Sequence, residues 1–289
     1  MDATVDCQPR PRTFPLPDRG GAMAALEFGP QARPIDVVFS HANGFNARTY
    51  RTILGPLAPS LRILALDLRG HGATTLPADP AHFPGWGAFA DDLAAVLDQA
   101  VAGPVVLAGH SLGATASLLC AAGGAQRVRG LVLFEPVMAD PQWVEITSVR
   151  EAMAATARRR RETFPDRAAA IEAYRGRGVF RSFSEAQLAD YAAAGLHETA
   201  DGQVTLACRA AWEAAIYAQQ DYDPLAALAA VRSPVRILAS PEDASSIDAH
   251  ARAFAQAAGA RLDVVAGSTH FLPLERPDIV REALLEAAL

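Results

Sequence analysis

A serine in a tight turn is the residue of this chain best suited to attack an electrophilic carbon. The pentapeptide GHSLG at 109–113 directly follows an apolar run, PVVLA, and directly precedes a stretch rich in helix formers. A serine at a sharp strand-to-helix turn has a strained backbone, and small flanking residues permit the close approach that such a turn requires. The pattern predicts that Ser111 is a nucleophile whose hydroxyl projects into a cleft. The alternative is a chance glycine-rich turn.

Such a nucleophile needs a base, because a serine hydroxyl is weak until its proton is removed. Among seven histidines, His270 has the most suitable position, after the last predicted strand and before the closing helix. Loops at the carboxyl ends of parallel strands open on one crevice, so His270 and Ser111 should meet there. We predict that His270 is the general base; the alternative is a histidine that only caps the last helix. The other histidines, in motif turns, helices or loops, are His41, His71, His82, His110, His197 and His250.

A carboxylate should orient the imidazole and stabilise its charged form. The next-to-last predicted strand, PVRILA, ends in Ser240-Pro241-Glu242-Asp243, and Asp243 is the preferred acid. Its neighbour Glu242 is an alternative. Glu135 is another, because it ends the run VRGLVLF, whose strand should neighbour that of the nucleophile.

Acyl transfer also requires two donors for the oxyanion. The backbone N–H of Leu112, at the start of a helix, is one candidate. The second is the N–H of Asn43, in the turn SHANGF that follows the run IDVVF. The alternative for Asn43 is a tight Asn-Gly turn that only needs positive φ.

Six short, nearly continuous apolar runs are separated by helical patterns in the later part of the chain. Continuous runs of this kind indicate strands buried on both faces of a parallel sheet. The runs are Ile35–Ser40, Leu61–Leu66, Pro104–Ala108, Val128–Phe134, Pro234–Ala239 and Arg261–Ala266. We predict an α/β fold with a doubly wound, mostly parallel sheet.

The segment 139–231 has no convincing strand and is too long for a loop in a compact domain. We predict an all-helical cap there, inserted into a core formed by residues 1–138 and 232–289. The substrate pocket is predicted to include Phe45, His110, Trp212, Tyr217 and Phe271, although Trp212 and Tyr217 also suit ordinary packing between cap and core. The run Arg158–Arg161 is interpreted as a solvated helix face; the alternative is a phosphate or anion site.

Composition excludes several kinds of chemistry. All 26 basic residues are arginine, so no lysine can form a Schiff base or complete a Walker-type phosphate loop. The net charge of −6 is spread along the chain, which is unlike a nucleic-acid-binding footprint. Three widely separated cysteines do not suggest a disulfide framework or a metal site. The first 30 residues have several prolines and no long apolar run. We therefore expect no metal, no cofactor, no nucleic acid and no membrane, but a cytoplasmic monomer or homodimer with a small-molecule substrate.

Four motifs in order resemble the α/β-hydrolase superfamily with a helical cap inserted after the sixth strand. They are the turn SHANGF, the loop DLRGHG at 67–72, the turn GHSLG and the terminal histidine in STHF. The resemblance covers most of the chain outside the cap, and its order of nucleophile, acid and histidine favours Asp243. Ala42 stands where glycine is commoner in the first motif. The serine in GHSLG argues against the dehalogenases and epoxide hydrolases of this superfamily, which attack with a carboxylate.

These observations predict a serine hydrolase that cleaves an ester-type bond of a small, largely apolar substrate through an acyl-enzyme on Ser111. The same residues could also serve a carbon–carbon bond hydrolase, a thioesterase, a lyase or a cofactor-free perhydrolase. A non-catalytic ligand-binding protein on this scaffold is a further alternative, although it would have no need of a complete constellation.

Overall fold

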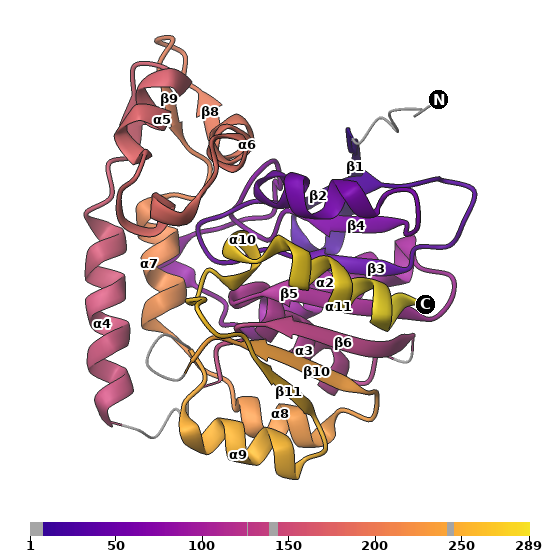
Figure 1. The fold of residues 1–289 in the computed structure, drawn as a ribbon. Coiled ribbons are helices and arrows are strands. Elements are labelled where there is room, and N and C mark those ends of the chain that lie inside the picture. The colour runs from indigo at the N-terminus through magenta and orange to yellow at the C-terminus, as the bar shows by residue number, and fades with distance from the viewer. Residues whose placement is uncertain (1–7, 126, 139–143, 242–245) are drawn as a thin grey trace.

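The order of strands in the central sheet decides which loops meet at its carboxyl edge. The computed structural model describes residues 8–125, 127–138, 144–241 and 246–289. Within these residues the central sheet has eight strands, in the order β1-β2-β4-β3-β5-β6-β10-β11 (Figure 1). The strands are β1 (Arg10–Leu16), β2 (Gly21–Phe28), β3 (Val37–Ser40), β4 (Ile63–Leu66), β5 (Val105–His110), β6 (Val128–Phe134), β10 (Val235–Ala239) and β11 (Arg261–Val264).

All neighbouring strands from β4 to β11 are parallel, which confirms the predicted doubly wound sheet. The six predicted runs correspond to β3, β4, β5, β6, β10 and β11. The antiparallel hairpin of β1 and β2 was not predicted. Its sequence lacks strand signals, because β1 contains Pro11 and Pro15 and β2 is rich in alanine. Prolines are tolerated in β1 because it is an edge strand.

Helices cover both faces of this sheet. Leu107 of β5 packs with α2, α3, α8 and α9 on one face, whereas its neighbours Val106 and Ala108 pack with α1 and α11 on the other. This burial on both faces explains the continuous apolar runs. The helices of the core are α1 (Arg51–Leu54), α2 (Gly87–Ala100), α3 (Leu112–Ala122), α9 (Ala249–Ala257), α10 (Leu272–Glu275) and α11 (Pro277–Ala288), with 3-10 turns η1 (Pro17–Arg19), η2 (Ala47–Tyr50), η3 (Gly55–Leu57) and η4 (Pro80–His82).

The chain between β6 and β10 forms most of a cap beside the carboxyl edge of the sheet (Figure 1). The cap elements are α4 (Val144–Arg158), β7 (Thr163–Phe164), α5 (Arg167–Tyr174), η5 (Gly178–Ser182), α6 (Glu185–Gly195), β8 (Leu196–Glu198), β9 (Val204–Leu206) and α7 (Ala210–Ala218). The last helix of this segment, α8 (Pro224–Ala230), instead packs with α3 and α9 on the central sheet. The prediction of an all-helical cap was wrong in one respect, because β7, β9 and β8 form a small antiparallel sheet. Strands of two or three residues are too short to produce a detectable period.

The helix α7 joins the cap to the core. The indole Nε1–H of Trp212 donates to the Arg69 carbonyl oxygen of the core at 3.1 Å. From the core, the indole of Trp86 donates to the Ile216 carbonyl of α7, also at 3.1 Å. The α7 helix also packs along α4 (Figure 1). One cap helix is thus fixed to the core by directional bonds as well as by apolar packing.

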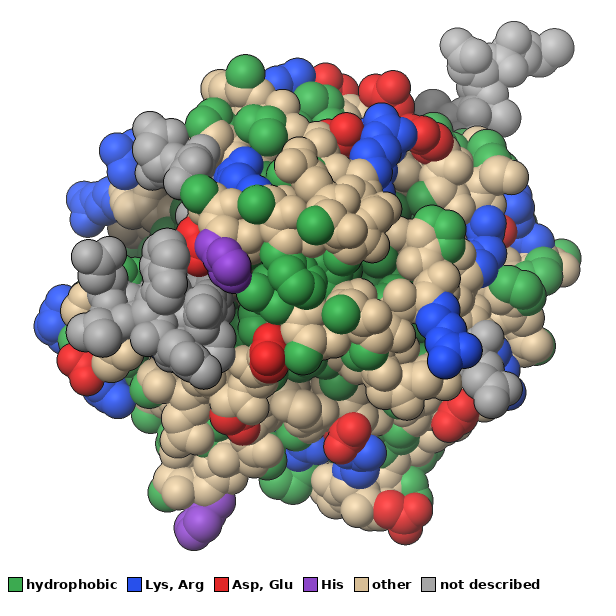
Figure 2. All heavy atoms as spheres, turned by 90° about the horizontal axis from the view of Figure 1, so that it is seen from below, with side chains coloured by type: hydrophobic (Ala, Val, Ile, Leu, Met, Phe, Trp, Pro, Cys, Tyr) green, Lys and Arg blue, Asp and Glu red, His purple; other side chains and the backbone are tan. Residues whose placement is uncertain are grey.

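Acidic and basic side chains are interspersed over the described surface of the underside of the molecule (Figure 2). Hydrophobic side chains also reach this surface, as expected for any folded protein. Of the helices in the described parts of the chain, none is both long enough and apolar enough to cross a bilayer.

Candidate active site

The turn between β5 and α3 holds Ser111 in a strained conformation. Ser111 has φ 53° and ψ −116°, a combination that costs roughly 1–3 kcal/mol for a non-glycine residue. Two glycines make the turn possible. A Cβ on Gly109 would lie 2.5 Å from the Gly113 carbonyl carbon, and a Cβ on Gly113 would lie 2.2 Å from the Ser40 carbonyl oxygen. The GHSLG pattern therefore has a steric cause. A larger residue at Gly109 would collide with the start of α3, and one at Gly113 would separate the turn from β3.

Ser111 and His270 lie within hydrogen-bond distance, as the sequence predicts. The Nε2 atom of His270 is 3.0 Å from the Ser111 Oγ, and its Nδ1 is 3.2 Å from the Glu135 Oε2. A carboxylate can only accept, so the proton of a neutral His270 lies on Nδ1 and the Ser111 hydroxyl donates to Nε2. This geometry suits removal of the serine proton by His270.

Glu135 is placed by strand register. In the parallel pair β5 and β6, His110 lies opposite Phe134, so the next residues, Ser111 and Glu135, leave the two strands side by side. Glu135 also has positive φ, at 50°, and its side chain is fully buried. Two adjacent strand ends thus each place one catalytic candidate on a strained backbone.

The buried carboxylate of Glu135 is stabilised in its ionised form. Its Oε1 accepts from the backbone N–H and, at 2.8 Å, from the hydroxyl of Ser240, and its Oε2 accepts from the Ser246 N–H at 3.0 Å. Burial alone would raise the pKa of Glu135, but the bond and charge interaction with His270 and the two backbone N–H groups outweigh it and lower the pKa to about 2. A permanently charged acceptor therefore faces His270 Nδ1.

Of the three predicted acids, the structure brings Glu135, the alternative, into contact with His270. The preferred Asp243 and its neighbour Glu242 lie outside the described residues. Sequence order favoured Asp243, because the order of motifs does not reveal that the strand ends of β5 and β6 are in register. The signal that identified Glu135 was its place directly after a buried run.

The predicted oxyanion turn lies against the start of α3, since the Gly113 Cα directly faces the Ser40 and His41 carbonyls. Among the described residues, none accepts a hydrogen bond from the backbone N–H of Asn43. Leu112 is the first residue of α3, where an N–H has no partner within the helix. Both remain available for an oxyanion, and their role stays a prediction.

Two buried histidines hold this turn in place, a role that the sequence did not identify. The Nε2 of His41 accepts from the Leu68 N–H at 2.9 Å, and the Nε2 of His71 accepts from the Gly44 N–H at 3.0 Å. Burial lowers the pKa of His41 well below its usual value and that of His71 to about 4. Both are therefore neutral near pH 7 and can accept these bonds. They join the turn to the DLRGHG loop.

Of the predicted pocket residues, three form an aromatic group next to the triad. The Phe45 ring lies 6.4 Å from the His110 ring and 6.2 Å from that of Phe271, and Phe183 of the cap is 5.5 Å from Phe45. Phe183 and Phe271 are partly exposed, whereas Phe45 and His110 are buried. Phe183 was not among the predicted pocket residues. This group gives the site an apolar wall.

Trp212 and Tyr217 both take part in packing, which was the alternative interpretation of these two residues. Trp212 is 1% exposed and belongs to a cluster with Leu68 and Phe89 of the core. Tyr217 packs against Ala154 and Ala214 of the cap. Trp212 therefore provides no exposed wall to the site, whereas Tyr217 is partly exposed and its place in the pocket stays a prediction.

Arg160 corrects the interpretation of its arginine run as a solvated face. Its guanidinium forms an ion pair with Glu213 of α7 and donates to the Tyr191 hydroxyl at 2.8 Å. A Cβ on Gly44 would lie about 3 Å from both members of this pair. In addition, the Asn43 amide donates to the Glu213 carbonyl at 3.2 Å. The cap thus contacts the predicted oxyanion turn through a partly buried ion pair.

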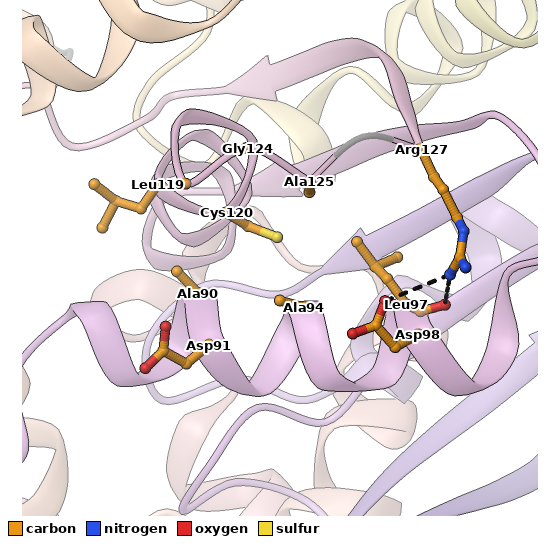
Figure 3. Close-up of a pocket in the computed structure, with 11 residues that line it drawn as sticks. Ala90, Asp91, Ala94, Leu97, Asp98, Leu119, Cys120, Gly124, Ala125 and Arg127 are labelled. Carbon is orange, nitrogen blue, oxygen red and sulfur yellow. Dashed lines mark hydrogen bonds and ion pairs between the residues drawn. The ribbon is translucent and has the colours of Figure 1, made fainter.

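A separate cleft lies between α2 and α3 (Figure 3). It has a volume of about 410 Å³, and Arg127 forms an ion pair with Asp98 at its rim. Its lining on α3 begins at Leu119, eight residues beyond Ser111 (119 − 111), or about 12 Å along a helix that rises 1.5 Å per residue. The cleft is therefore distinct from the site around the triad.

The described residues contain no group of three or more His, Cys, Asp or Glu side chains that could hold a metal ion. Cys120 and Cys208 are free and buried, and burial raises the pKa of Cys120 to about 12. A thiol held in its protonated form is a poor nucleophile. The reactive constellation that the described residues present is the line of Ser111, His270 and Glu135.

The chain is similar to known proteins. A family model described as "Alpha/beta hydrolase family" matches residues 37–283. The chain is 34% identical over 125 residues to Esterase Rv0045c and 34% identical over 114 residues to Lipase LipV, both of Mycobacterium tuberculosis strain H37Rv. These matches cover 42% and 39% of this chain, but only 40% and 41% of the relatives' own lengths.

Solved structures are similar over nearly the whole chain. The crystal structure of E-2-(acetamidomethylene)succinate hydrolase has a TM-score of 0.80 at 24% identity, and covers 96% of this chain and 98% of its own. A thioesterase domain from the curacin biosynthetic pathway has a TM-score of 0.77 at 17% identity, with coverage of 96% and 99%. At these identities the similarity establishes the fold alone.

Proposed function

Because the chain belongs to the alpha/beta hydrolase family, we propose that it hydrolyses a carboxylic ester of a small, largely apolar molecule through an acyl-enzyme on Ser111. The observation that carries the proposal is the hydrogen-bonded line from Ser111 Oγ through His270 to Glu135. The esterase and the lipase that share 34% identity with parts of the chain support ester chemistry.

In the first half of the reaction, His270 Nε2 takes the proton of Ser111 while Oγ attacks the ester carbonyl carbon. The carbonyl oxygen becomes an oxyanion, which the N–H groups of Leu112 and Asn43 stabilise. The tetrahedral intermediate then collapses. Its carbon–oxygen bond to the alcohol breaks, His270 returns the proton to the departing alcohol oxygen, and the acyl group stays on Ser111.

In the second half, a water molecule gives its proton to His270 and attacks the acyl carbon. The same donors stabilise the second oxyanion, and Ser111 recovers its proton when the acid leaves. Throughout both halves the Glu135 carboxylate accepts from His270 Nδ1–H and favours the imidazolium form. The depressed pKa of Glu135 keeps this acceptor charged at every pH near neutrality.

The aromatic wall supports an apolar group on one side of the ester. Phe45 of the predicted oxyanion turn contacts Phe183 of the cap and Phe271 of the loop that carries the base, so three elements contribute to this wall. Partly exposed aromatic rings favour apolar or aromatic ligands by area burial. We expect a small-molecule substrate of this kind, taken up without a cofactor.

The test that needs no knowledge of the substrate is reaction with a fluorophosphonate probe, followed by intact mass and peptide mapping. We expect one adduct, on Ser111, that is absent in Ser111→Ala and in His270→Ala. Ser117→Ala is the matched control, because Ser117 is buried in α3, the helix that follows Ser111. Its hydroxyl donates to the Gly113 carbonyl at 2.8 Å. A p-nitrophenyl ester series from acetate to octanoate would then measure the acyl preference.

Two results would overturn the proposal. The first is a folded wild-type protein that forms no adduct and hydrolyses none of the esters. The second is a Ser111→Ala variant that retains the ester activity of the wild type, because the acyl-enzyme requires that hydroxyl.

A further inference from the structure

A chain of hydrogen bonds connects the oxyanion turn with the backbone of the base. The Ala42 N–H donates to the Tyr50 hydroxyl oxygen at 3.2 Å, Tyr50 lies 2.7 Å from His110 Nδ1, and His110 Nε2 lies 2.7 Å from the His270 carbonyl oxygen. Tyr50 and His110 are fully buried. This series of hydrogen bonds starts at Ala42, one residue before Asn43, and ends at His270, the proposed base.

The direction of each bond follows from its two ends. The His270 carbonyl can only accept, so the proton of a neutral His110 lies on Nε2. The lone pair of His110 Nδ1 then accepts, and the Tyr50 hydroxyl donates to it. The Tyr50 oxygen remains free to accept from the Ala42 N–H. Burial lowers the pKa of His110 to about 3, which agrees with this neutral form.

We propose that Tyr50 and His110 are positioning residues that hold the oxyanion turn and the His270 loop in register with each other across the nucleophile. The proposal rests on the proposed function, because it concerns the donors and the base of that reaction. Neither side chain is required to touch the substrate carbonyl. Each acts through a backbone group, one at Ala42 and the other at His270.

The rest of the His270 loop explains why such a bond is needed. Neighbouring Thr269 is tied on the outer side by its N–H and its hydroxyl to Glu275, at 2.7 and 2.8 Å. The His270 carbonyl is tied on the inner side by His110. Without the inner bond, the His270 backbone loses the partner of its carbonyl, and the imidazole is placed on this side only by its own bonds to Ser111 and Glu135. Its position relative to Ser111 then becomes less defined. A misplacement of about 1 Å can reduce the rate roughly a hundredfold.

The predicted oxyanion turn depends on the bond from the Ala42 N–H to the Tyr50 hydroxyl. The Ala42 N–H is buried, so loss of its acceptor leaves an unpaired donor in the core. The turn can satisfy that donor only by moving, and Asn43 would move with it. Removing the Tyr50 hydroxyl therefore affects both ends at once, since His110 Nδ1 also loses its donor.

The experiment compares two tyrosine-to-phenylalanine variants by kcat and KM on a p-nitrophenyl ester and by the rate of Ser111 phosphonylation. Tyr50→Phe removes the hydroxyl but retains the ring contact with Phe39, at 4.8 Å. Tyr222→Phe is the matched control, because its hydroxyl also donates to an internal carbonyl, that of Val137 at 3.0 Å, and takes part in none of the bonds between Ala42 and His270. We expect kcat to fall about 10- to 100-fold in Tyr50→Phe with KM within about threefold, and no such fall in Tyr222→Phe.

Two variants of His110 distinguish its bond to Tyr50 from its bond to the His270 carbonyl. A glutamine places a donor near the position of Nε2, and an asparagine places an acceptor near the position of Nδ1. His110→Gln should therefore retain more activity than His110→Asn if the bond to His270 matters more, and His110→Ala should lose most. In a double variant, Tyr50→Phe should lower kcat less in the His110→Ala background than in the wild type, because the hydrogen bonds through His110 are already absent there.

A spectroscopic measurement checks the proton assignment. In protein with ¹⁵N-labelled histidine, His110 should show the Nε2–H tautomer from pH 5 to 9, and Tyr50→Phe should shift its Nδ1 signal. The positioning proposal is overturned if Tyr50→Phe matches Tyr222→Phe in kcat, or if His110 carries its proton on Nδ1. These outcomes differ from failure of the proposed function, in which the wild-type protein itself shows neither phosphonylation nor ester hydrolysis.

Discussion

The carboxyl edge of the central sheet and the cap hold their polar groups in different ways. At the sheet edge, Ser111 and Glu135 follow adjacent strands in register, and each has a strained backbone that the surrounding sheet supports. In the cap, the positions of polar groups depend on single side-chain contacts, such as the ion pair of Arg160 with Glu213. Strands of two or three residues provide little support there.

This difference indicates that the core and the cap contribute to the site in different ways. Every polar group of the triad has a partner that comes from the sheet or from its loops, so the reactivity of Ser111 should depend on the core. The cap contacts the predicted oxyanion turn at Gly44, through the Asn43 amide and through Phe183, so its influence should be felt mainly in stability, in the placement of the turn and in the apolar wall. The following changes test that division.

The largest effect should follow from removal of the charge that faces His270. We expect Glu135→Gln to lower kcat/KM on a p-nitrophenyl ester by about 10³- to 10⁴-fold, because the imidazolium loses its counter-charge and the tautomer is no longer fixed. The amide also places an NH₂ group next to the donors of Ser240 and Ser246, which require an acceptor. The midpoint of thermal unfolding should therefore fall as well.

Asp243→Asn is the informative counterpart, because sequence order favoured that acid. It should retain activity within a few fold of the wild type. A greater loss in Asp243→Asn than in Glu135→Gln would transfer the acid role to Asp243 and would contradict the triad proposed above.

The core of the site could be predicted from sequence because its signals are local and steric. The GHSLG turn requires glycine on both sides of Ser111, and this requirement is visible in five residues. His270 was identifiable because it lies between a strand and the closing helix. The six parallel strands were visible as apolar runs, since burial on both faces removes polar alternation.

The rest depends on contacts between distant parts of the chain. The choice of Glu135 required the register of β5 with β6, and the bond from Tyr50 to His110 joins residues that are 60 positions apart. Arg160 looked like its exposed neighbours because nothing in the run shows which guanidinium meets Glu213. Such pairings are set by tertiary packing, for which a single sequence carries no periodic signal.

In the cap, the strongest effect should come from breaking the ion pair of Arg160. Arg160→Met leaves the mostly buried Glu213 without its cation, and we expect a loss of about 3 kcal/mol in the free energy of unfolding by urea. The double variant with Glu213→Leu should recover part of this loss. Arg159→Met is the matched control from the same run, since Arg159 is exposed and should change stability by less than about 0.5 kcal/mol.

The core has a pH-sensitive group of its own in Asp67. Burial raises the pKa of Asp67 to about 6 from 3.8, although the N–H groups of Ala47 and Ala73 oppose the shift. Between pH 3.8 and 6 the folded protein holds this proton more tightly than the unfolded chain. The contribution of Asp67 to stability should therefore decrease as pH rises through this window, by up to about 3 kcal/mol, and stay constant above it.

The measurement is urea unfolding of wild type and Asp67→Asn at half-unit steps from pH 4 to 7.5. Groups common to both proteins cancel in the difference between their free energies of unfolding. That difference should favour wild type most at the acidic end. A difference that is independent of pH would show that Asp67 titrates at its ordinary pKa in the folded protein.

The smallest effect should come from the indole bond that joins α7 to the core. Trp212→Phe loses the bond from Nε1 to the Arg69 carbonyl but keeps most of the buried ring, so we expect a loss of about 1–2 kcal/mol. Trp86→Phe removes the equivalent bond to Ile216 from the core side and should cost about the same. Neither change should alter the rate of Ser111 phosphonylation by more than about twofold, because neither bond touches the triad, the donors or the chain through Tyr50 and His110. A tenfold slower reaction in either variant would mean that α7 takes part in positioning the nucleophile, and the division between a reactive core and a stabilising cap would no longer hold.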